Sequence, residues 1–106
     1  MTKPSALSDY DRRQIDRLRE RLLRFQDETI SFHSLVFDIE GLINALENVP
    51  EEFRDNLQHH WGVLDEVYAD MADQERKQFD KLDLGLIENA ITELLELTNF
   101  SAETDE

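Results

Sequence analysis

Hydrophobic residues recur at intervals of three and four positions along most of the chain, and strict alternation of apolar and polar residues over a strand length does not occur. The clearest stripe lies in residues 32–47 and consists of Phe32, Leu35, Val36, Ile39, Leu42, Ile43 and Leu46. This spacing gathers apolar side chains on one face of an α-helix. Only three glycines and two prolines interrupt the chain. The pattern therefore predicts an all-α protein.

The first half of the chain predicts two helices. Ser8 precedes the first helix, residues 9–27, and suits an N-cap because its hydroxyl can accept a hydrogen bond from a first-turn backbone N–H. The apolar face of this helix is expected to consist of Ile15, Leu18, Leu22 and Phe25. Ser31 suits the N-cap of the second helix, residues 32–47, for the same reason.

The second half predicts two more helices. Pro50 fits the first turn of a helix over residues 51–73, where its missing N–H has no intrahelical partner. The inward face of this helix is expected to consist of Phe53, Leu57, Trp61, Leu64, Tyr68 and Met71. A polar connection follows over residues 72–82, and Asp83 is the expected N-cap of a fourth helix, residues 84–98. The inward-facing residues of that helix are predicted to be Leu84, Ile87, Ile91, Leu94 and Leu95.

The length and composition of the chain suit one domain. With 106 residues, of which 40% are hydrophobic, it can build one modest core. We expect residues 1–106 to form an antiparallel four-helix bundle with every apolar stripe turned inward, because this arrangement buries four amphipathic helices most economically. Residues 1–7 and 99–106 are expected to be frayed tails.

The chain is strongly acidic, with 25 Asp and Glu against 11 Lys and Arg, and its formal net charge is −14. The excess belongs to residues 31–106, which hold nineteen acidic and four basic residues, whereas residues 1–30 hold six and seven. Because a negative surface repels phosphate groups, we do not expect binding to nucleic acid or to anionic lipid. This charge favours a basic protein as the partner.

Sequence patterns for catalysis, cofactors and metals are missing. The chain has no cysteine, no glycine-rich phosphate loop and no Gly-x-Ser-x-Gly elbow. Asp55 and His59 lie one helical turn apart, but no His-Glu-x-x-His or Glu-x-x-His pattern supplies further ligands. We therefore predict that the protein is not an enzyme and has no catalytic, cofactor-binding or metal site.

The sequence contains no signal for export or membrane insertion. The first residues have no apolar run of signal-peptide length, and no apolar stretch approaches the ~20 residues that span a bilayer. The absence of cysteine gives no indication of an oxidising compartment. We expect a cytoplasmic protein that does not bind membranes.

Acidic side chains follow the predicted outer face of residues 51–73. At about 100° per residue, the positions opposite the apolar stripe include Gly62, and the partner-binding residues predicted there are Glu52, Asp55, His59, Glu66, Asp70 and Asp73. Arg54 is the only basic residue in this segment, so the charge is not balanced within the helix. In the alternative interpretation, arginines of the first helix lie across this segment and neutralise it. They are Arg12, Arg13, Arg17, Arg19, Arg21 and Arg24.

Phe37 and Gly62 depart from the pattern of their helices. Phe37 lies roughly opposite the apolar stripe of residues 32–47, so it is either an exposed interface anchor or a core residue covered by the first helix. Glycine inside a helix costs about 1 kcal/mol relative to alanine and often marks the close approach of another backbone. For Gly62, that backbone can belong to a partner or to this chain.

Two segments resemble a known family. Residues 30–42, ISFHSLVFDIEGL, and residues 61–69, WGVLDEVYA, resemble small bacterial immunity proteins of the colicin D and contact-dependent inhibition type. These are acidic helical proteins, so the resemblance implies an inhibitor that binds a cognate toxin domain in the cytoplasm. For a nuclease toxin, carboxylates of the acidic face would take the place of substrate phosphates.

Two other functions remain compatible with the sequence. The protein can be a structural or adaptor bundle that self-associates through apolar residues such as Phe37, Val63 or Leu97. It can also be an acidic DNA mimic that binds a DNA-processing protein. The sequence leaves open whether the protein is a monomer or a weak homodimer.

Overall fold

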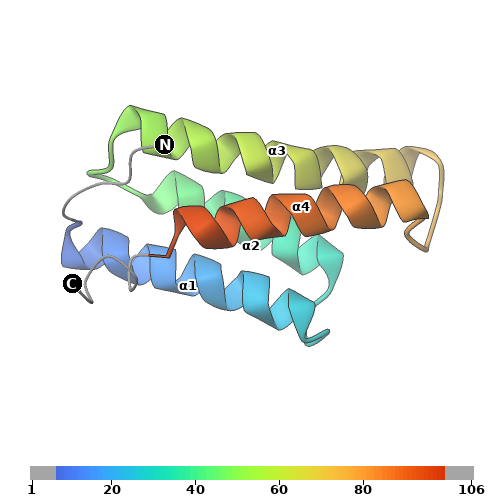
Figure 1. Cartoon of the computed structure of the whole chain (residues 1–106), viewed down its shortest axis with the longest axis horizontal. Helices are drawn as coiled ribbons and strands as arrows, with labels where there is room; N and C mark the ends of the chain where they lie inside the picture. Colours follow the sequence, from blue (N-terminus) through green and yellow to red (C-terminus); the bar gives the residue numbers. More distant parts are fainter. Residues whose placement is uncertain (1–6, 100–106) are drawn as a thin grey trace.

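The computed structural model describes residues 7–99 and contains four α-helices (Figure 1). They are α1 (Asp9–Gln26), α2 (Phe32–Ala45), α3 (Glu51–Asp73) and α4 (Lys81–Leu97). Residues 7–99 contain no β-strand. Successive helices run in opposite directions, and this confirms the predicted all-α, antiparallel four-helix bundle.

The predicted frayed tails fall largely outside the described part of the chain. Residues 1–6 and 100–106 lie outside it. Leu7, which the prediction placed in the first tail, is half-buried and packs against the core. The N–H of Asn99 donates to the carbonyl of Glu96 (3.3 Å), so the described end of the second predicted tail continues from α4.

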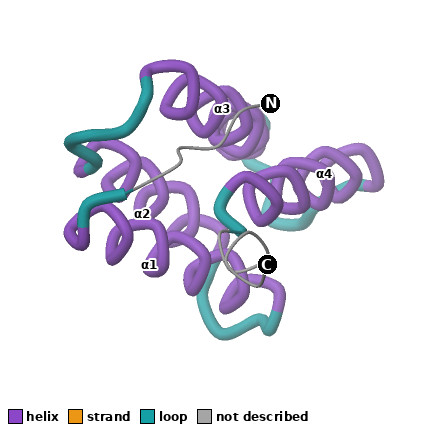
Figure 2. The backbone as a smooth tube through the Cα atoms, turned by 60° about the vertical axis from the view of Figure 1, so that its left-hand side comes forward, coloured by secondary structure: helices purple, strands orange, loops and turns teal. Residues whose placement is uncertain are grey.

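Helices that follow one another in the sequence are also neighbours around the bundle. α1 packs on α2, α2 on α3 and α3 on α4, and α4 closes the ring against α1. α1 and α3 therefore occupy opposite corners (Figure 2). The C-terminal end of α4 is tied to α1 because the Arg19 guanidinium donates to the carbonyl of Leu95 (2.6 Å) and to the hydroxyl of Thr98 (3.2 Å). The N-terminal end of α4 extends past the end of α1 (Figure 1).

All four helices contribute to the hydrophobic core. The buried apolar residues are Ile15, Leu18, Leu22, Leu35, Val36, Ile39, Ile43, Leu46, Phe53, Leu57, Leu64, Val67, Ile87, Ala90, Ile91, Leu94 and Leu97. Trp61, Tyr68 and Met71 were predicted to be buried but are only half-buried. Trp61 Nε1 donates to the carbonyl of Val36 (2.8 Å), and the Tyr68 hydroxyl lies 2.7 Å from His33 Nδ1. Their polar ends keep these two rings at the edge of the core.

Serine caps begin α1 and α2 as predicted. Ser8 Oγ accepts the Asp11 N–H, and Ser31 Oγ accepts the Ser34 N–H, both at 3.1 Å. These bonds satisfy N–H groups that have no partner within the helix. Pro50 precedes α3 and makes no side-chain cap hydrogen bond.

The start of α4 corrects the prediction of Asp83 as its N-cap. Asp80 is the N-cap, and its carboxylate accepts the Asp83 N–H (2.8 Å), while Asp83 accepts the Asp80 N–H (3.0 Å). This reciprocal pair is a capping box. Leu84, predicted to face inward, is 52% exposed. It lies two turns before Ile91 on the same side of α4, but α1 ends before it can cover Leu84.

The Asp83 carboxylate also holds the loop between α3 and α4. The Arg76 guanidinium donates to it at 2.5 Å and lies 3.4 Å from Asp80 Oδ2. The hydrogen bond from Arg76, together with the Asp80 N–H, lowers the pKa of Asp83 despite its burial. Asp83 therefore forms a structural ion pair with Arg76. Because Asp80 and not Asp83 is the N-cap, α4 begins three residues earlier than predicted.

The C-terminal end of α2 is fixed by Asp11 of α1. The Asp11 carboxylate is fully buried and accepts the N–H groups of Glu47 and Asn48, each at 2.8 Å. The Arg54 guanidinium donates to the carbonyl of Ile43 at 2.7 Å and also to that of Leu46. Because the N–H groups that would continue the helix are turned to Asp11, α2 ends at Ala45, two residues earlier than predicted.

Candidate functional site

The outward face of α3 carries the predicted partner-binding residues. All six of those predicted on this helix are exposed: Glu52, Asp55, His59, Glu66, Asp70 and Asp73. The structure adds two exposed carboxylates on the same helix that the prediction did not include, Glu51 and Asp65. We refer to the seven exposed carboxylates as the α3 acidic surface. They are Glu51, Glu52, Asp55, Asp65, Glu66, Asp70 and Asp73.

The α3 acidic surface has two charged ends and a neutral middle. Its total length is roughly 33 Å, because an α-helix rises about 1.5 Å per residue. Three of the carboxylates lie in the first five residues of α3, and four lie between Asp65 and Asp73. The outer positions between the two groups hold Gln58, His59 and Gly62. A partner that covers the whole surface would therefore meet two negative patches about 15 Å apart along the helix.

The arginines of α1 do not neutralise this surface, because α1 and α3 are not adjacent in the bundle. Their described partners lie elsewhere. Arg19 donates to the C-terminal end of α4, Arg21 pairs with Asp38 of α2 (3.6 Å), and Arg24 pairs with Glu20 of its own helix (3.2 Å). Within residues 7–99, no ion pair joins α1 to α3. Among the described residues, α1 therefore neutralises a carboxylate of α2 through Arg21, but its arginines form no ion pair with α3.

One cation does act on the C-terminal end of the surface. The pKa of Arg76 is raised chiefly by its hydrogen bond to Asp83, and the carboxylates of Asp80 and Asp70 add to this. Asp70 therefore lies in the field of a positive charge, although Arg76 is held by the loop and not by α3. The compensation at this end is partial, because Arg76 already balances Asp83.

Gly62 faces open space on the neutral middle of the surface. A Cβ built at this position would meet no atom within 4 Å among the described residues. Close packing among residues 7–99 therefore does not account for the glycine. Its backbone remains accessible to an approaching partner.

We predict that Gly62→Ala raises the free energy of unfolding by about 0.5–1 kcal/mol, because alanine loses less backbone entropy on folding and fits the open space. The increase in Tm should be roughly 2–8 °C in a thermal melt. Gly85→Ala on α4, where a Cβ also meets nothing within 4 Å, is the matched control and should give a similar gain. A loss of stability in Gly62→Ala alone would reveal an unseen contact at this position.

Phe37 is exposed and belongs to an aromatic group at the seam between α2 and α3. It is 50% exposed, and its ring lies 4.5 Å from the His33 ring and 5.7 Å from the Tyr68 ring, edge-on to the latter. His33 and Tyr68 were not predicted as site residues. Asp65 of the α3 acidic surface precedes Tyr68 by three residues and so lies on the same side of α3. The aromatic group therefore borders the acidic surface.

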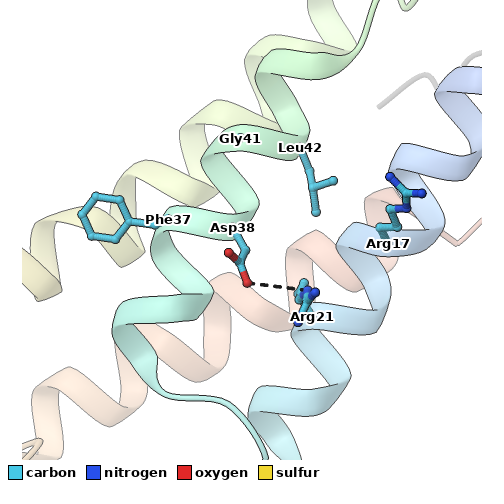
Figure 3. A pocket seen from close by; sticks show the side chains of 6 residues that line it. All are labelled: Arg17, Arg21, Phe37, Asp38, Gly41 and Leu42. Carbon is cyan, nitrogen blue, oxygen red and sulfur yellow. Dashed lines mark ion pairs between the residues drawn. The ribbon is translucent and has the colours of Figure 1, made fainter.

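The first helix does not cover Phe37. A shallow depression of about 430 Å³ lies on the surface where α1 meets α2 and is lined by Arg17, Arg21, Phe37, Asp38, Gly41 and Leu42. Figure 3 shows the Phe37 ring on the far side of α2 from the two arginines. Of the two predicted interpretations, an exposed aromatic residue agrees with the structure. Among the other residues considered for self-association, Leu97 is buried and Val63 is half-buried against the core.

The histidines of α3 lie side by side, with ring centroids 5.0 Å apart. Burial lowers the pKa of His60, and the neighbouring His59 adds to this, whereas Glu93 of α4 acts in the opposite direction. Residues 7–99 contain no group of three or more His, Asp or Glu side chains that could hold a metal ion. In the same part of the chain, no helix has the length and apolar character needed to cross a membrane.

Comparisons with protein-family models, with curated proteins and with solved structures give no match for this chain.

Proposed function

We propose that this protein is an immunity protein that binds a cognate bacterial toxin and blocks it with the α3 acidic surface. One observation carries the proposal: seven exposed carboxylates lie on one helix, at the corner of the bundle opposite the arginines of α1. A surface that served solubility alone would mix both signs of charge. The resemblance of residues 30–42 and 61–69 to immunity proteins supports the same function.

A nuclease is the toxin class that suits this chemistry best. Nuclease clefts hold phosphate groups with lysine and arginine side chains, and these side chains also pair with carboxylates. The two charged ends of the surface can occupy the phosphate positions of such a cleft. His59 and the open backbone at Gly62 would lie between them, at the centre of the interface.

Phe37 supplies an apolar contact beside these charges. Charged pairs at an interface contribute to specificity and association rate, whereas buried aromatic side chains contribute a large share of the binding energy. Half of the Phe37 surface is available to a partner, and its ring is held against Tyr68. An arginine of the partner can also stack on this aromatic group.

The inhibitor function makes the association rate important, because a cytoplasmic inhibitor must reach the toxin before the toxin reaches its substrate. Complementary charges raise association rates about 10- to 1,000-fold over those of uncharged surfaces. With a formal net charge of −14, this chain would attract a basic toxin domain over a long range. Salt shortens that range to about 8 Å at physiological ionic strength.

The test is binding to the protein encoded by the neighbouring reading frame. We predict a one-to-one complex in size-exclusion chromatography with light scattering, loss of the nuclease activity of the partner, and an affinity that weakens as salt rises. A neighbouring product without toxicity, together with a dimer of this chain, would support the adaptor function instead. Binding to a DNA-processing enzyme, with inhibition of its DNA binding, would support the DNA mimic.

A further inference from the structure

A second surface, separate from the α3 acidic surface, lies where α4 extends past α1. It is an open groove of about 780 Å³, and we refer to it as the α4 groove. Its lining residues come from the end of α1, the connection to α2, the first residue of α2, the loop before α4, and α4 itself. They are Phe25, Gln26, Glu28, Ile30, Ser31, Phe32, Phe79, Leu84, Ile87, Glu88 and Ile91.

The groove follows from the different lengths of the helices. α1 ends at Gln26, and the chain turns away through Glu28, whose φ of 61° lies in the left-handed region. α4 continues beside this turn for several more residues, so its first two turns have no helix against the side that α1 covers further along. Ile87 and Ile91 form the buried floor, and Leu84 is left 52% exposed at the edge.

The wall opposite α4 is apolar and held in place. The Phe32 ring lies 5.7 Å from the Phe25 ring and 5.2 Å from the Phe79 ring, the latter edge-on. Phe32 begins α2 and Phe79 lies 47 positions later in the sequence, so their contact joins α2 to the loop before α4. A fixed apolar wall needs little ordering when a ligand binds, and this lowers the cost of association.

The shape of the groove suits the apolar face of a helix. Leu84 and Glu88 are exposed and lie one turn apart on α4, beside the buried Ile87 and Ile91, and they form an edge against which a fifth helix can pack. Recognition of this kind uses apolar side chains at i, i+3, i+4 and i+7 of the bound helix.

The charge around the groove selects between the possible occupants. Its lining contains the carboxylates of Glu28 and Glu88 and no lysine or arginine. A second copy of the chain would bring together two molecules that each carry a formal net charge of −14. An amphipathic helix with basic residues beside its apolar stripe would instead complement both the groove and its edges.

We propose that the α4 groove binds a basic amphipathic helix of another protein. The apolar side chains of that helix lie between Leu84 and the phenylalanine wall, and its lysines or arginines face Glu28 and Glu88. This inference does not depend on the proposed toxin, because the groove and the α3 acidic surface are formed by different residues.

The probe is a synthetic helical peptide of leucine and lysine, about 18 residues long, with leucine at i, i+3, i+4 and i+7 spacing. A peptide of the same composition in scrambled order, which lacks an apolar face, is its control. Binding is measured by fluorescence anisotropy at about 150 mM salt, where long-range attraction is screened. Nuclear magnetic resonance then maps the contacted residues on the unmodified protein.

Leu84→Glu places a charge at the edge of the groove and should weaken peptide binding about tenfold or more. Leu82→Glu is the matched control, because Leu82 is 71% exposed on the same helix, does not line the groove and gains the same charge. Its affinity should stay within about twofold of the unmodified protein. Glu88→Lys keeps the apolar lining and should weaken binding by removing one rim carboxylate.

The mapping keeps the inference testable if Leu84→Glu folds poorly. Amide signals of Gln26, Glu28 and Glu88 should shift on addition of the amphipathic peptide and not of the scrambled one. Three results would overturn the inference. They are equal affinities for Leu84→Glu and Leu82→Glu, signal shifts confined to α3, and a dimer of this chain that Leu84→Glu dissociates, which would make a second copy the occupant.

Discussion

Replacing Asp11 by alanine should lower the free energy of unfolding by about 3 kcal/mol at pH 7, because the N–H groups of Glu47 and Asn48 would lose their buried acceptor. Tm should fall by roughly 10–20 °C. Each unsatisfied buried N–H costs about 1–3 kcal/mol, and the total stability of a small protein is only about 5–15 kcal/mol. The loss is measured by chemical denaturation monitored by circular dichroism.

The effect of Asp11 should depend on pH in a defined direction. Burial alone would raise the pKa of Asp11, but the N–H groups of Glu47 and Asn48, the Ser8 hydroxyl and the Arg54 charge together lower it below its ordinary value. A carboxylate whose pKa is lower in the folded state stabilises the protein above its unfolded-state pKa, and this contribution disappears as pH falls through the folded-state pKa. The difference between the unmodified protein and Asp11→Asn should therefore be full at pH 7 and should shrink below about pH 4.

The control for Asp11 is Asp16→Ala on the same helix. Asp16 is exposed, so its removal should change stability by no more than about 0.5 kcal/mol. If Asp11→Ala costs no more than Asp16→Ala, water or another residue satisfies the two N–H groups, and the carboxylate does not fix the end of α2. Equal pH dependence of the unmodified protein and Asp11→Asn would lead to the same conclusion.

The example of Asp11 shows where sequence reasoning reaches its limit. A carboxylate in the first turn of a helix, such as Asp11 in α1, is favoured by the helix dipole alone. Its hydrogen-bond partners are 36 and 37 positions away, and only the packing of α1 beside the end of α2 brings them together. Local patterns predict the caps Ser8 and Ser31 because each bonds to a residue three positions ahead.

The start of α4 could have been predicted from the sequence. Asp80 and Asp83 have the three-residue spacing of a capping box, but the usual pattern has Glu or Gln at the second position, and Asp83 before an apolar residue was the simpler cap. The exposure of Leu84 could not be predicted from the sequence, because the helical period places Leu84 on the same side of α4 as the buried Ile91. It is exposed because α1 ends too early to cover it, and this depends on the relative lengths of two helices far apart in the sequence.

The candidate site could be predicted only in part, because helical periodicity is a local pattern whereas the contacts between helices are not. Helical periodicity identifies most of the outward-facing polar residues of 51–73: each of the six residues predicted on α3 is exposed, but the exposed carboxylates of Glu51 and Asp65 were not among them. The sequence left open whether the arginines of α1 lie near them. That question depends on the order of the helices around the bundle, in which α1 and α3 are diagonal. His33 and Tyr68 were missed because their contact joins two helices across 35 positions.

The double substitution Glu66→Lys/Asp70→Lys should slow association with the proposed toxin partner about 100-fold at low ionic strength, as expected if these carboxylates steer the encounter. Both residues are exposed, and they are four positions apart on α3. Exchanging one like-charged i,i+4 pair for another leaves the helix energetics nearly unchanged, and the lost attraction between Asp70 and Arg76 is weak at the exposed surface, so the circular dichroism spectrum should be unchanged and Tm should fall by no more than a few degrees. Association is measured by stopped-flow fluorescence over a range of salt concentrations.

The control for this prediction is Asp16→Lys/Glu20→Lys, which changes the net charge by the same amount at the same spacing but on α1. Glu20 pairs with Arg24 at the surface, and the loss of such an exposed pair costs only about 0.5 kcal/mol. If charge position matters, the α3 variant should associate about tenfold or more slowly than the α1 variant, and the gap should narrow with salt. If the two variants associate at equal rates, only the total charge attracts the partner, and the toxin-binding face must be sought elsewhere on the bundle.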